Sequence, residues 1–247
     1  MKNYNQRVIN FSGGKTSAYM TIQEYHEGDL VIFCDTGREH PKTYKFINDF
    51  EAHENIPIIK LGGVNSFKEL LQKKKYKVIP NRVKRLCTVE LKIKLCRRYL
   101  RSLGLMQYEN FVGFRADEPL RVKRRKQQWK KVIDKFPLYE QGIDKQMSND
   151  YWSKKPYTLE IPSILGNCDL CFMKGKNAII AILREYPELA DKWIEDEDEA
   201  QKHGKFGGHT YFPDVTIRQL RDIAQNNLFK DYGLDEIKPA FDCACTT

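Results

Sequence analysis

The sequence predicts an α/β protein with an open, mostly parallel sheet that carries helices on both faces. Short apolar runs alternate with longer helical segments through the first half of the chain, and this alternation is typical of parallel strands covered on both faces. Val, Ile, Leu and aromatic residues are spread along all 247 residues. The composition therefore excludes wholesale disorder and supports one sizeable core.

The expected elements follow in order from the N-terminus. Strands are predicted at 8–11, 30–34, 56–61 and 108–114, and helices at 15–25, 41–53, 91–103 and 176–200. From about Phe136, Pro and Gly interruptions replace the regular alternation. We expect an α/β core over residues 1–135 and a helical, cysteine-bearing appendage packed on it over residues 136–247. The acidic stretch from Glu195 to Glu199 is expected to be a solvated helix end.

Charge is unevenly distributed along the chain. The whole sequence has 42 Lys+Arg and 33 Asp+Glu, whereas Lys60 to Lys135 alone has 23 Lys+Arg and 6 Asp+Glu. This basic 60–135 region predicts a polyanionic partner such as DNA or tRNA, with a solvated basic face as the alternative. No apolar run approaches the roughly 20 residues of a membrane span, and the opening residues lack the apolar segment of a secretory signal. We therefore expect a cytoplasmic protein with no membrane partner.

A glycine-containing loop follows the first predicted strand. Ser12-Gly-Gly-Lys-Thr-Ser17 lies between that strand and a helix, where backbone N–H groups and the helix N-terminus bind anions. It is not a Walker A loop, because Ile9 stands where that motif needs its first glycine. The alternative is a tight turn with a capping serine.

The loop resembles the Ser-Gly-Gly-x-x-Ser loop of the PP-loop superfamily, and four further motifs resemble its PAPS (phosphoadenylyl-sulfate) reductase-like family. They are Cys34-Asp-Thr-Gly-Arg-Glu-His-Pro41, Arg85-Leu-Cys-Thr-Val-Glu-Leu-Lys92, Gly113-Phe-Arg-Ala-Asp-Glu118 with Arg121, and Gly166-Asn-Cys-Asp-Leu-Cys-Phe172. The chain is also similar to the ATP-using sulfurtransferases of DNA phosphorothioation and to the PP-loop tRNA thiolases. The resemblance covers most of the chain.

The resemblance implies a site for ATP or PAPS. Its phosphate, sulfate and adenosine parts are expected to contact Ser12, Gly13, Gly14, Lys15, Thr16, Ser17, Asp35, Thr36, Gly37 and Arg38. The residues expected to act in catalysis are Cys87, Lys92, Arg115 and Arg121. The three cations would clamp anionic oxygens, which guanidinium groups bind bidentately. Asp117 and Glu118 would either carry Mg²⁺ or pair with an arginine, and we favour the pairing.

The cysteines indicate a metal site. Seven cysteines without a secretory signal are not typical of a disulfide framework. Cys168 and Cys171 form one chelating pair and Cys243 and Cys245 another, which suits tetrahedral zinc or an iron–sulfur cluster. We expect Cys34 and Cys96 to be core thiols.

Resemblance to iron–sulfur adenylyl-sulfate reductases adds Cys87 to this set. Those enzymes carry a Cys-Cys pair at a similar spacing before the Cys-x-x-Cys, and here Thr88 replaces the second cysteine of that pair. We therefore prefer a [4Fe-4S] cluster held by Cys87, Cys168 and Cys171 with Cys243 or Cys245. Zinc held by the two pairs alone is the alternative, since the thiolate preferences of the two metals overlap.

Two classes of function stay open. Reductases of this family end in a cysteine tail that attacks the sulfonucleotide, whereas this sequence ends Phe241-Asp-Cys-Ala-Cys-Thr-Thr247. The first class is an enzyme that either transfers sulfur from a donor protein to nucleic acid or reduces a sulfonucleotide with a reductant protein. The second class is a non-catalytic nucleotide-binding or nucleic-acid-binding module with a structural zinc.

Overall fold

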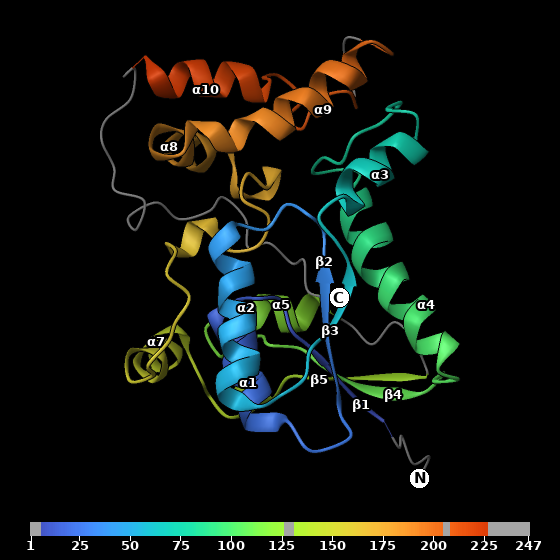
Figure 1. The fold of residues 1–247 in the computed structure, drawn as a ribbon, viewed down its shortest axis with the longest axis vertical. Coiled ribbons are helices and arrows are strands. Elements are labelled where there is room, and N and C mark those ends of the chain that lie inside the picture. The colour runs from blue at the N-terminus through green and yellow to red at the C-terminus, as the bar shows by residue number, and fades with distance from the viewer. Residues whose placement is uncertain (1–5, 126–130, 205–207, 227–247) are drawn as a thin grey trace.

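The computed structural model describes residues 6–125, 131–204 and 208–226. In these residues one sheet of five parallel strands has the order β3-β2-β1-β4-β5 (Figure 1). The strands are β1 (Arg7–Asn10), β2 (Leu30–Asp35), β3 (Ile59–Gly62), β4 (Tyr108–Phe111) and β5 (Val132–Lys135). The predicted fold class is confirmed.

The strand order reverses direction at β1. This strand pairs with β2 on one side and β4 on the other, so that Ile9 lies opposite both Val31 and Phe111. In open α/β sheets a crevice forms at the carboxyl ends of the strands where the order reverses, and ligands bind there. The loops that follow β1 and β4 therefore border the place where a ligand is expected.

Local sequence signals explain where several helices begin. The α-helices are α1 (Lys15–Glu24), α2 (Pro41–Glu54), α3 (Ser66–Lys73), α4 (Lys94–Ser102), α5 (Pro119–Arg124), α6 (Pro137–Glu140), α7 (Lys145–Ser153), α8 (Lys176–Glu185), α9 (Asp191–Gln201) and α10 (Ile217–Gln225). A π-helix, η1 (Thr88–Ile93), leads directly into α4. Pro41 starts α2 because its fixed φ suits the first helical position. Asp144 caps α7, and Thr216 forms a capping box with Gln219 at the start of α10.

Helices cover both faces of the sheet. On one face, Ile9 and Phe33 pack in a cluster that includes residues of α1 and α2. On the other face, Val8 and Ile32 pack with Leu100 of α4. Successive strand residues point to opposite faces, which explains how neighbouring residues of β1 and β2 belong to different clusters.

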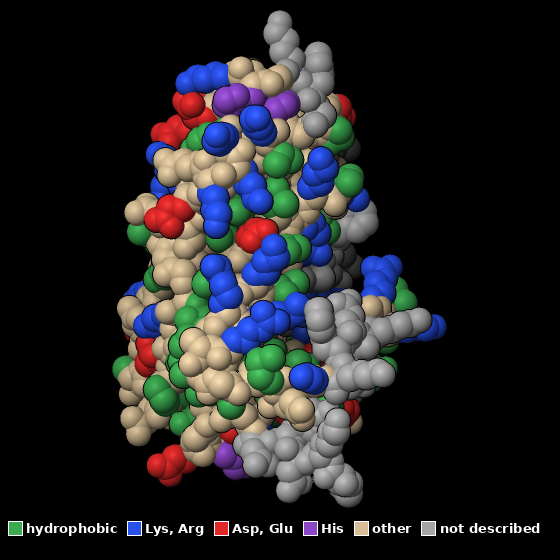
Figure 2. All heavy atoms as spheres, turned by 90° about the vertical axis from the view of Figure 1, so that its right-hand side faces the viewer, with side chains coloured by type: hydrophobic (Ala, Val, Ile, Leu, Met, Phe, Trp, Pro, Cys, Tyr) green, Lys and Arg blue, Asp and Glu red, His purple; other side chains and the backbone are tan. Residues whose placement is uncertain are grey.

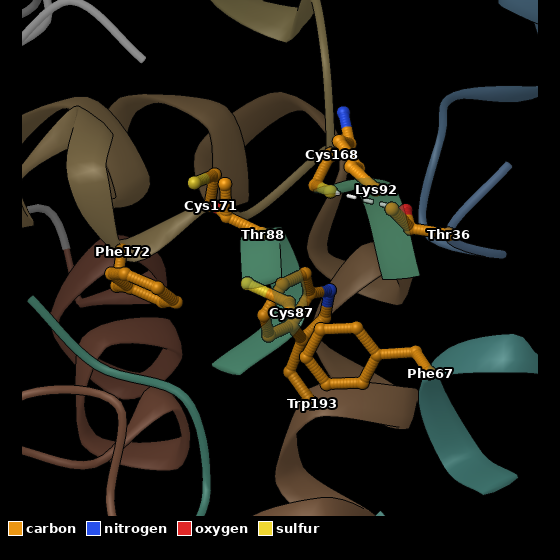
Figure 3. Close-up of a pocket in the computed structure, with 9 residues that line it drawn as sticks. All are labelled: Thr36, Phe67, Cys87, Thr88, Lys92, Cys168, Cys171, Phe172 and Trp193. Atoms are coloured by element: carbon orange, nitrogen blue, oxygen red, sulfur yellow. Dashed lines mark hydrogen bonds between the residues drawn. The ribbon is translucent and has the colours of Figure 1, made fainter. Parts of the chain in front are cut away.

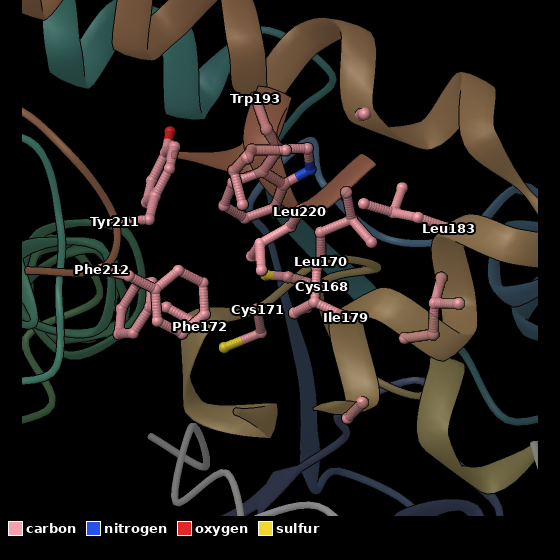
Figure 4. Packing of buried hydrophobic residues seen from close by; sticks show 14 of the residues in the cluster. Cys168, Leu170, Cys171, Phe172, Ile179, Leu183, Trp193, Tyr211, Phe212 and Leu220 are labelled. Atoms are coloured by element: carbon pink, nitrogen blue, oxygen red, sulfur yellow. The ribbon is translucent and has the colours of Figure 1, made fainter. Parts of the chain in front are cut away.

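The C-terminal helices build a third apolar cluster (Figure 4). Ile179 and Leu183 of α8 are fully buried in it, together with Trp193 of α9 and Leu220 of α10. Phe67 of α3 belongs to the same cluster. The helical part therefore packs against the first half of the chain, and a division into two domains at residues 135 and 136 stays a prediction.

Besides helices that were not predicted, such as α3, α7 and α10, three features differ from the expectations for a clear physical reason. The strand β5 was not foreseen, because its sequence Val-Ile-Asp-Lys is only half apolar and its residues are all part-exposed. The long helix expected over 176–200 is interrupted at Pro187, which cannot continue the helical hydrogen bonding. The expected solvated acidic end is wrong for Asp196 and Glu197, which are 3% and 2% exposed. None of the described helices has both the length and the apolar character needed to cross a membrane.

Candidate nucleotide site and cysteine cavity

The loop after β1 opens α1 without a capping side chain. Gly14 stands at the N-cap of the helix, and among the described residues no side chain accepts from the amides of its first turn. Uncapped N–H groups at a helix N-terminus, at the positive end of the helix dipole, bind anionic oxygens. This geometry supports the predicted anion-binding role of residues 12–17.

Ser17 closes the loop through hydrogen bonds of its side chain. Its Oγ accepts from the Ser12 N–H at 3.0 Å and lies 3.0 Å from the Gly14 carbonyl oxygen, to which it donates. The two serine hydroxyls are 2.9 Å apart. The Ser17 side chain, which we expected to donate to phosphate, is thus already engaged in closing the loop.

Gly13 brings the loop close to helix α2. Its φ of +76° lies in the left-handed region, and a Cβ there would meet Thr43 Cγ2 at 2.8 Å. A side chain at this position would be strained by both the backbone and the contact. The loop therefore depends on glycine for its shape and for its packing on α2.

Trp152 of α7 also holds the loop. Its Nε1 donates to the Lys15 carbonyl oxygen at 2.9 Å, and its ring packs edge-on against Phe46 of α2. Partial burial lowers the pKa of the Lys15 ammonium. Sequence reasoning missed Trp152, because nothing in its local pattern signals a contact with a loop far away in the chain.

Arg115 lies beside the same loop, as its position after β4 predicts. Its guanidinium donates to Thr16 Oγ1 at 3.4 Å and to the Asp117 carboxylate at 2.8 and 3.0 Å. Arg121 donates to Glu118 at 2.5 Å and stacks over the Phe114 ring. The pairing that we favoured for Asp117 and Glu118 is confirmed, and ion pairing with Arg115 lowers the pKa of Asp117.

The turn after β2 is fixed by Asp35 and Gly37. Asp35 Oδ1 accepts from the Gly37 N–H at 2.7 Å and from the Tyr44 hydroxyl at 2.8 Å. Gly37 has φ +75°, and a Cβ there would lie 2.3 Å from the Val64 carbonyl oxygen. Only glycine fits this turn.

Arg38 points away from the glycine loop. Its guanidinium is buried, forms an ion pair with Asp196 of α9, and lies over the rings of Phe67 and Trp193. The expectation that Arg38 holds the nucleotide therefore needs correction. The side chain is committed to the packing between the β2 loop and the C-terminal helices.

A small cavity lies at the end of β2, next to this packing. Figure 3 shows the three described cysteines of the predicted cluster around it. Its lining residues are Thr36, Phe67, Cys87, Thr88, Lys92, Cys168, Cys171, Phe172 and Trp193. The structure thus brings Cys87 to the Cys168–Cys171 pair, as the resemblance implied.

Backbone and side-chain contacts join the cysteine segment to the β2 loop. Glu39 and Cys168 form an antiparallel bridge, and the Asp169 N–H donates to the Arg38 carbonyl oxygen at 2.9 Å. Thr36 Oγ1 lies 3.3 Å from Cys168 Sγ. The β2 loop therefore forms one wall of the cavity and also leads into α2, on which the glycine loop packs.

Buried polar side chains hold the cysteine segment in place through hydrogen bonds. Lys174 Nζ donates to the carbonyl oxygens of Cys168 and Asp169, both at 2.7 Å. Trp193 Nε1 donates to Asp169 Oδ1 at 2.8 Å, and burial raises the pKa of this carboxyl. Sequence reasoning missed Lys174 and Asp169, although their place beside the Cys-x-x-Cys pair was a usable signal.

The predicted catalytic residues fall into two groups. Cys87 and Lys92 are buried and line the cavity, whereas Arg115 and Arg121 belong to the glycine-loop side. Cys34 and Cys96 are core thiols as expected, and burial raises their pKa values to about 12 and about 11. Cys243 and Cys245 lie outside the described residues. Within the described part of the chain, no three His, Cys, Asp or Glu side chains gather as ligands of one metal ion.

The parallel sheet, the uncapped glycine loop and the arginine beside it characterise an α/β protein whose first strand meets a helix with the geometry typical of an anion-binding site. Sequence comparison then identifies the family. The phosphoadenosine phosphosulfate reductase domain matches residues 6–144, which is more than half of the chain. The chain belongs to this family, and the predicted resemblance is confirmed. The similarity to DNA phosphorothioation enzymes stays a prediction.

Several known proteins are similar to the chain. An uncharacterized nin region protein of Escherichia phage lambda is 31% identical over 201 residues, covering 70% of this chain and 67% of that protein. Two uncharacterized proteins of Methanocaldococcus jannaschii are 28% and 29% identical, covering 79% and 80% of this chain. The chain spans only 42% and 51% of those two proteins. A solved PAPS reductase of Candida auris, in complex with phosphate, aligns with a TM-score of 0.40 and 18% identity over 63% of this chain and 76% of its own.

Proposed function

We propose that the chain is an enzyme that binds ATP or PAPS at residues 12–17 and performs sulfur chemistry at the cysteine cavity. The family supports this proposal, since its domain is named for an adenine sulfonucleotide. One observation carries it. Thr36 and Glu39 contact Cys168, and Thr43, which follows them at the start of α2, packs closely on Gly13. A single segment thus links the loop to the cavity.

The glycine loop would bind and orient the anionic part of the nucleotide. The amides at the start of α1 would donate to phosphate or sulfate oxygens, and Lys15 would add positive charge. Arg115 stands at Thr16, where its guanidinium can reach the same oxygens by exchanging its partner Asp117. Asp35, Thr36 and Gly37 would flank the adenosine, and Mg²⁺ would accompany the phosphates if ATP is the ligand.

The cavity would hold a [4Fe-4S] cluster through Cys87, Cys168 and Cys171, with Cys243 or Cys245 as the fourth ligand. Three buried thiols from two distant segments line one space, and cysteine thiolates are the usual ligands of such a cluster. Zinc held by the two cysteine pairs alone would leave no role for Cys87. A bound cluster would supply electron transfer or a site for sulfur. Lys92, also buried at the cavity, would place its ammonium beside these thiolates.

Two reactions are compatible with this arrangement. With ATP, an acceptor oxygen would bond to the α-phosphorus as pyrophosphate leaves, and sulfur from a donor protein would then displace AMP. With PAPS, a reductant protein would supply two electrons, and the products would be sulfite and adenosine 3′,5′-bisphosphate. The non-catalytic module with a structural zinc is the competing function.

The test uses the full-length chain, purified anaerobically. We expect iron and acid-labile sulfide in the protein, calorimetric binding of ATP or PAPS, and release of pyrophosphate or sulfite. Cys171→Ala should lose the iron and reduce turnover more than 100-fold, while nucleotide affinity stays within twofold. Cys96→Ala is the matched control, because it removes a buried thiol outside the cavity and should retain the iron.

Each result separates the alternatives. Zinc without iron would favour the two-pair metal site. Nucleotide binding without release of either product would favour the non-catalytic module. Failure to bind either nucleotide in a protein that holds its metal would reject the proposed function.

A further inference from the structure

The segment from Ser66 to Arg101, which contains α3, α4 and the connection between them, carries a strong excess of positive charge. Between Ser66 and Arg101 the sequence has 13 Lys+Arg and 2 Asp+Glu. Figure 2, which looks onto the side of the molecule formed by these helices, shows Lys and Arg side chains along much of its length and few acidic ones. We call this surface the α3–α4 face, and define it by the exposed side chains of Lys73, Lys75, Lys84, Lys94, Arg98 and Arg101.

The cations of this face converge on a single carboxylate. Glu90 forms an ion pair with Lys94 at 2.9 Å. Its pKa is lowered by that pairing and further by Lys74 and Lys73 at the end of α3. The ends of α3 and η1 are therefore close enough for their charges to interact. One carboxylate cannot neutralise three lysines, so the face keeps a net positive charge.

Other surfaces of the molecule balance their charges locally. Lys45 pairs with Asp49, Lys60 with Glu51, and Arg218 with Asp198. Within the segment from Ser66 to Arg101, Lys94 pairs with Glu90. The formal charge of this segment is +11 (13 − 2), whereas the whole chain has +9, so the excess is a local property and not a feature of the whole chain.

The cations of α4 form a stripe along the helix. Lys94, Arg98 and Arg101 are separated by four and three residues, which places them on one side of an α-helix. At 1.5 Å per residue the stripe is about 10 Å long. One strand of a duplex carries a phosphate about every 3.4 Å of the helix axis, and neighbouring phosphates lie farther apart than this because the strand winds round the axis. The stripe is therefore long enough to contact about two consecutive phosphates.

The same segment forms a wall of the cysteine cavity. Thr88 and Lys92 of η1 line the cavity, while Glu90 and Lys94 belong to the outer face. The helix continues from η1 into α4 without a break. A polyanion lying along α4 would therefore run toward the wall that carries Cys87 and Lys92.

We infer that the α3–α4 face binds the sugar–phosphate backbone of a nucleic acid, and that this nucleic acid is the sulfur acceptor. The inference rests on the proposed function for the chemistry, whereas the binding itself depends only on the face. Repeated cations along α4 and along the connection from α3 match a linear chain of phosphates better than a single small anion. Backbone contacts of this kind position a nucleic acid without reading its sequence.

The test measures binding of fluorescein-labelled DNA duplex and unmodified tRNA to the full-length chain by anisotropy at several salt concentrations. The variant is Arg98→Glu with Arg101→Glu. The matched control is Lys145→Glu with Lys154→Glu, which reverses two exposed charges at α7. We expect the first variant to lower affinity at least tenfold and to reduce the slope of log K against log salt by about 2. The control should bind like the parent chain.

Melting curves and calorimetry with ATP and PAPS separate this inference from the proposed function. Nucleic-acid binding lost in the α4 variant, with an intact fold, supports the inference whether or not nucleotide binds. Salt-dependent binding of DNA or of tRNA supports the inference, and the nucleic acid that binds more tightly is the one that fits the face better. Absence of binding at low salt, equal loss in both variants, or stronger binding to vesicles of anionic phospholipid than to either nucleic acid would overturn it.

Discussion

The glycine loop and the cysteine cavity are built in different ways, although both stand at the carboxyl ends of central strands. The loop is made by local backbone geometry, with Gly13 at φ +76° and uncapped amides at the start of α1. The cavity is made by side chains from the β2 loop, α3, η1, α9 and the Cys-x-x-Cys segment. The glycine loop therefore depends on backbone conformation, whereas the cysteine cavity depends on distant segments that pack around buried polar groups.

The largest effect is expected at Glu197, a buried carboxylate of α9 on the same side of the molecule as the cysteine cavity. It accepts from the Tyr211 and Ile217 N–H groups inside the helical cluster. Burial raises its pKa from 4.5 to about 7. Between these values the unfolded chain releases a proton that the folded chain keeps. The protonated Glu197 therefore contributes its full share to the free energy of unfolding below pH 4.5. As the pH rises from 4.5 to about 7, this contribution falls by about 3 kcal/mol.

Urea unfolding of the parent chain and of Glu197→Gln at pH 5, 6 and 7.5 measures this effect. The free energy of unfolding of the parent, relative to the variant, should fall across this range. Gln also removes one acceptor, which shifts all values by a similar amount and leaves the pH slope as the readout. A difference between the two proteins that does not change with pH would contradict the prediction.

Gly13→Ala tests the backbone side of the comparison. Alanine would be strained at this φ and would press on Thr43 Cγ2, which together should cost about 2 kcal/mol of stability. Because the strain moves the anion-binding amides, we expect at least a tenfold loss of affinity for ATP or PAPS, measured by calorimetry. Bound metal should not change.

Gly142→Ala is the matched control for that substitution. Gly142 has a similar φ of +72°, and a Cβ there would meet nothing within 4 Å. It should lose about 1 kcal/mol of stability through backbone strain alone and keep its nucleotide affinity. Equal nucleotide affinities in the two alanine variants would show that the conformation of Gly13 does not matter to the site.

The sequence predicted the parallel sheet and the glycine loop because both are governed by local patterns. Apolar runs such as 30–34 report strands, and Ser12 to Ser17 specify the turn within six consecutive residues. Arg115 was expected at the nucleotide site through the family resemblance, and the register of β4 against β1 explains why the chain leaves the sheet beside the loop. Short-range signals were sufficient for the sheet and the glycine loop.

The rest of the candidate site depends on contacts that no local pattern contains. Arg38 follows the β2 turn in sequence, yet its guanidinium is buried because it forms an ion pair with Asp196 of the distant helix α9. The sequence pattern predicts that Asp196 and Glu197 are solvated, because it does not show that Tyr211 donates hydrogen bonds to both of them in the folded chain. Cys87 was placed correctly only through resemblance to a family, because its distance along the chain from Cys168 says nothing of their distance in space.

Trp152 joins α7 to the glycine loop, and its substitution should have the smallest effect. Trp152→Phe keeps an aromatic ring against Phe46 and removes the hydrogen bond to the Lys15 carbonyl oxygen. One such bond contributes about 1 kcal/mol, so we expect nucleotide affinity to fall about fivefold while bound metal is unchanged. Tyr151→Phe, in the same aromatic cluster but without a bond to the loop, should bind nucleotide normally. Equal affinities in both variants would mean that α7 packs against the nucleotide loop without positioning it.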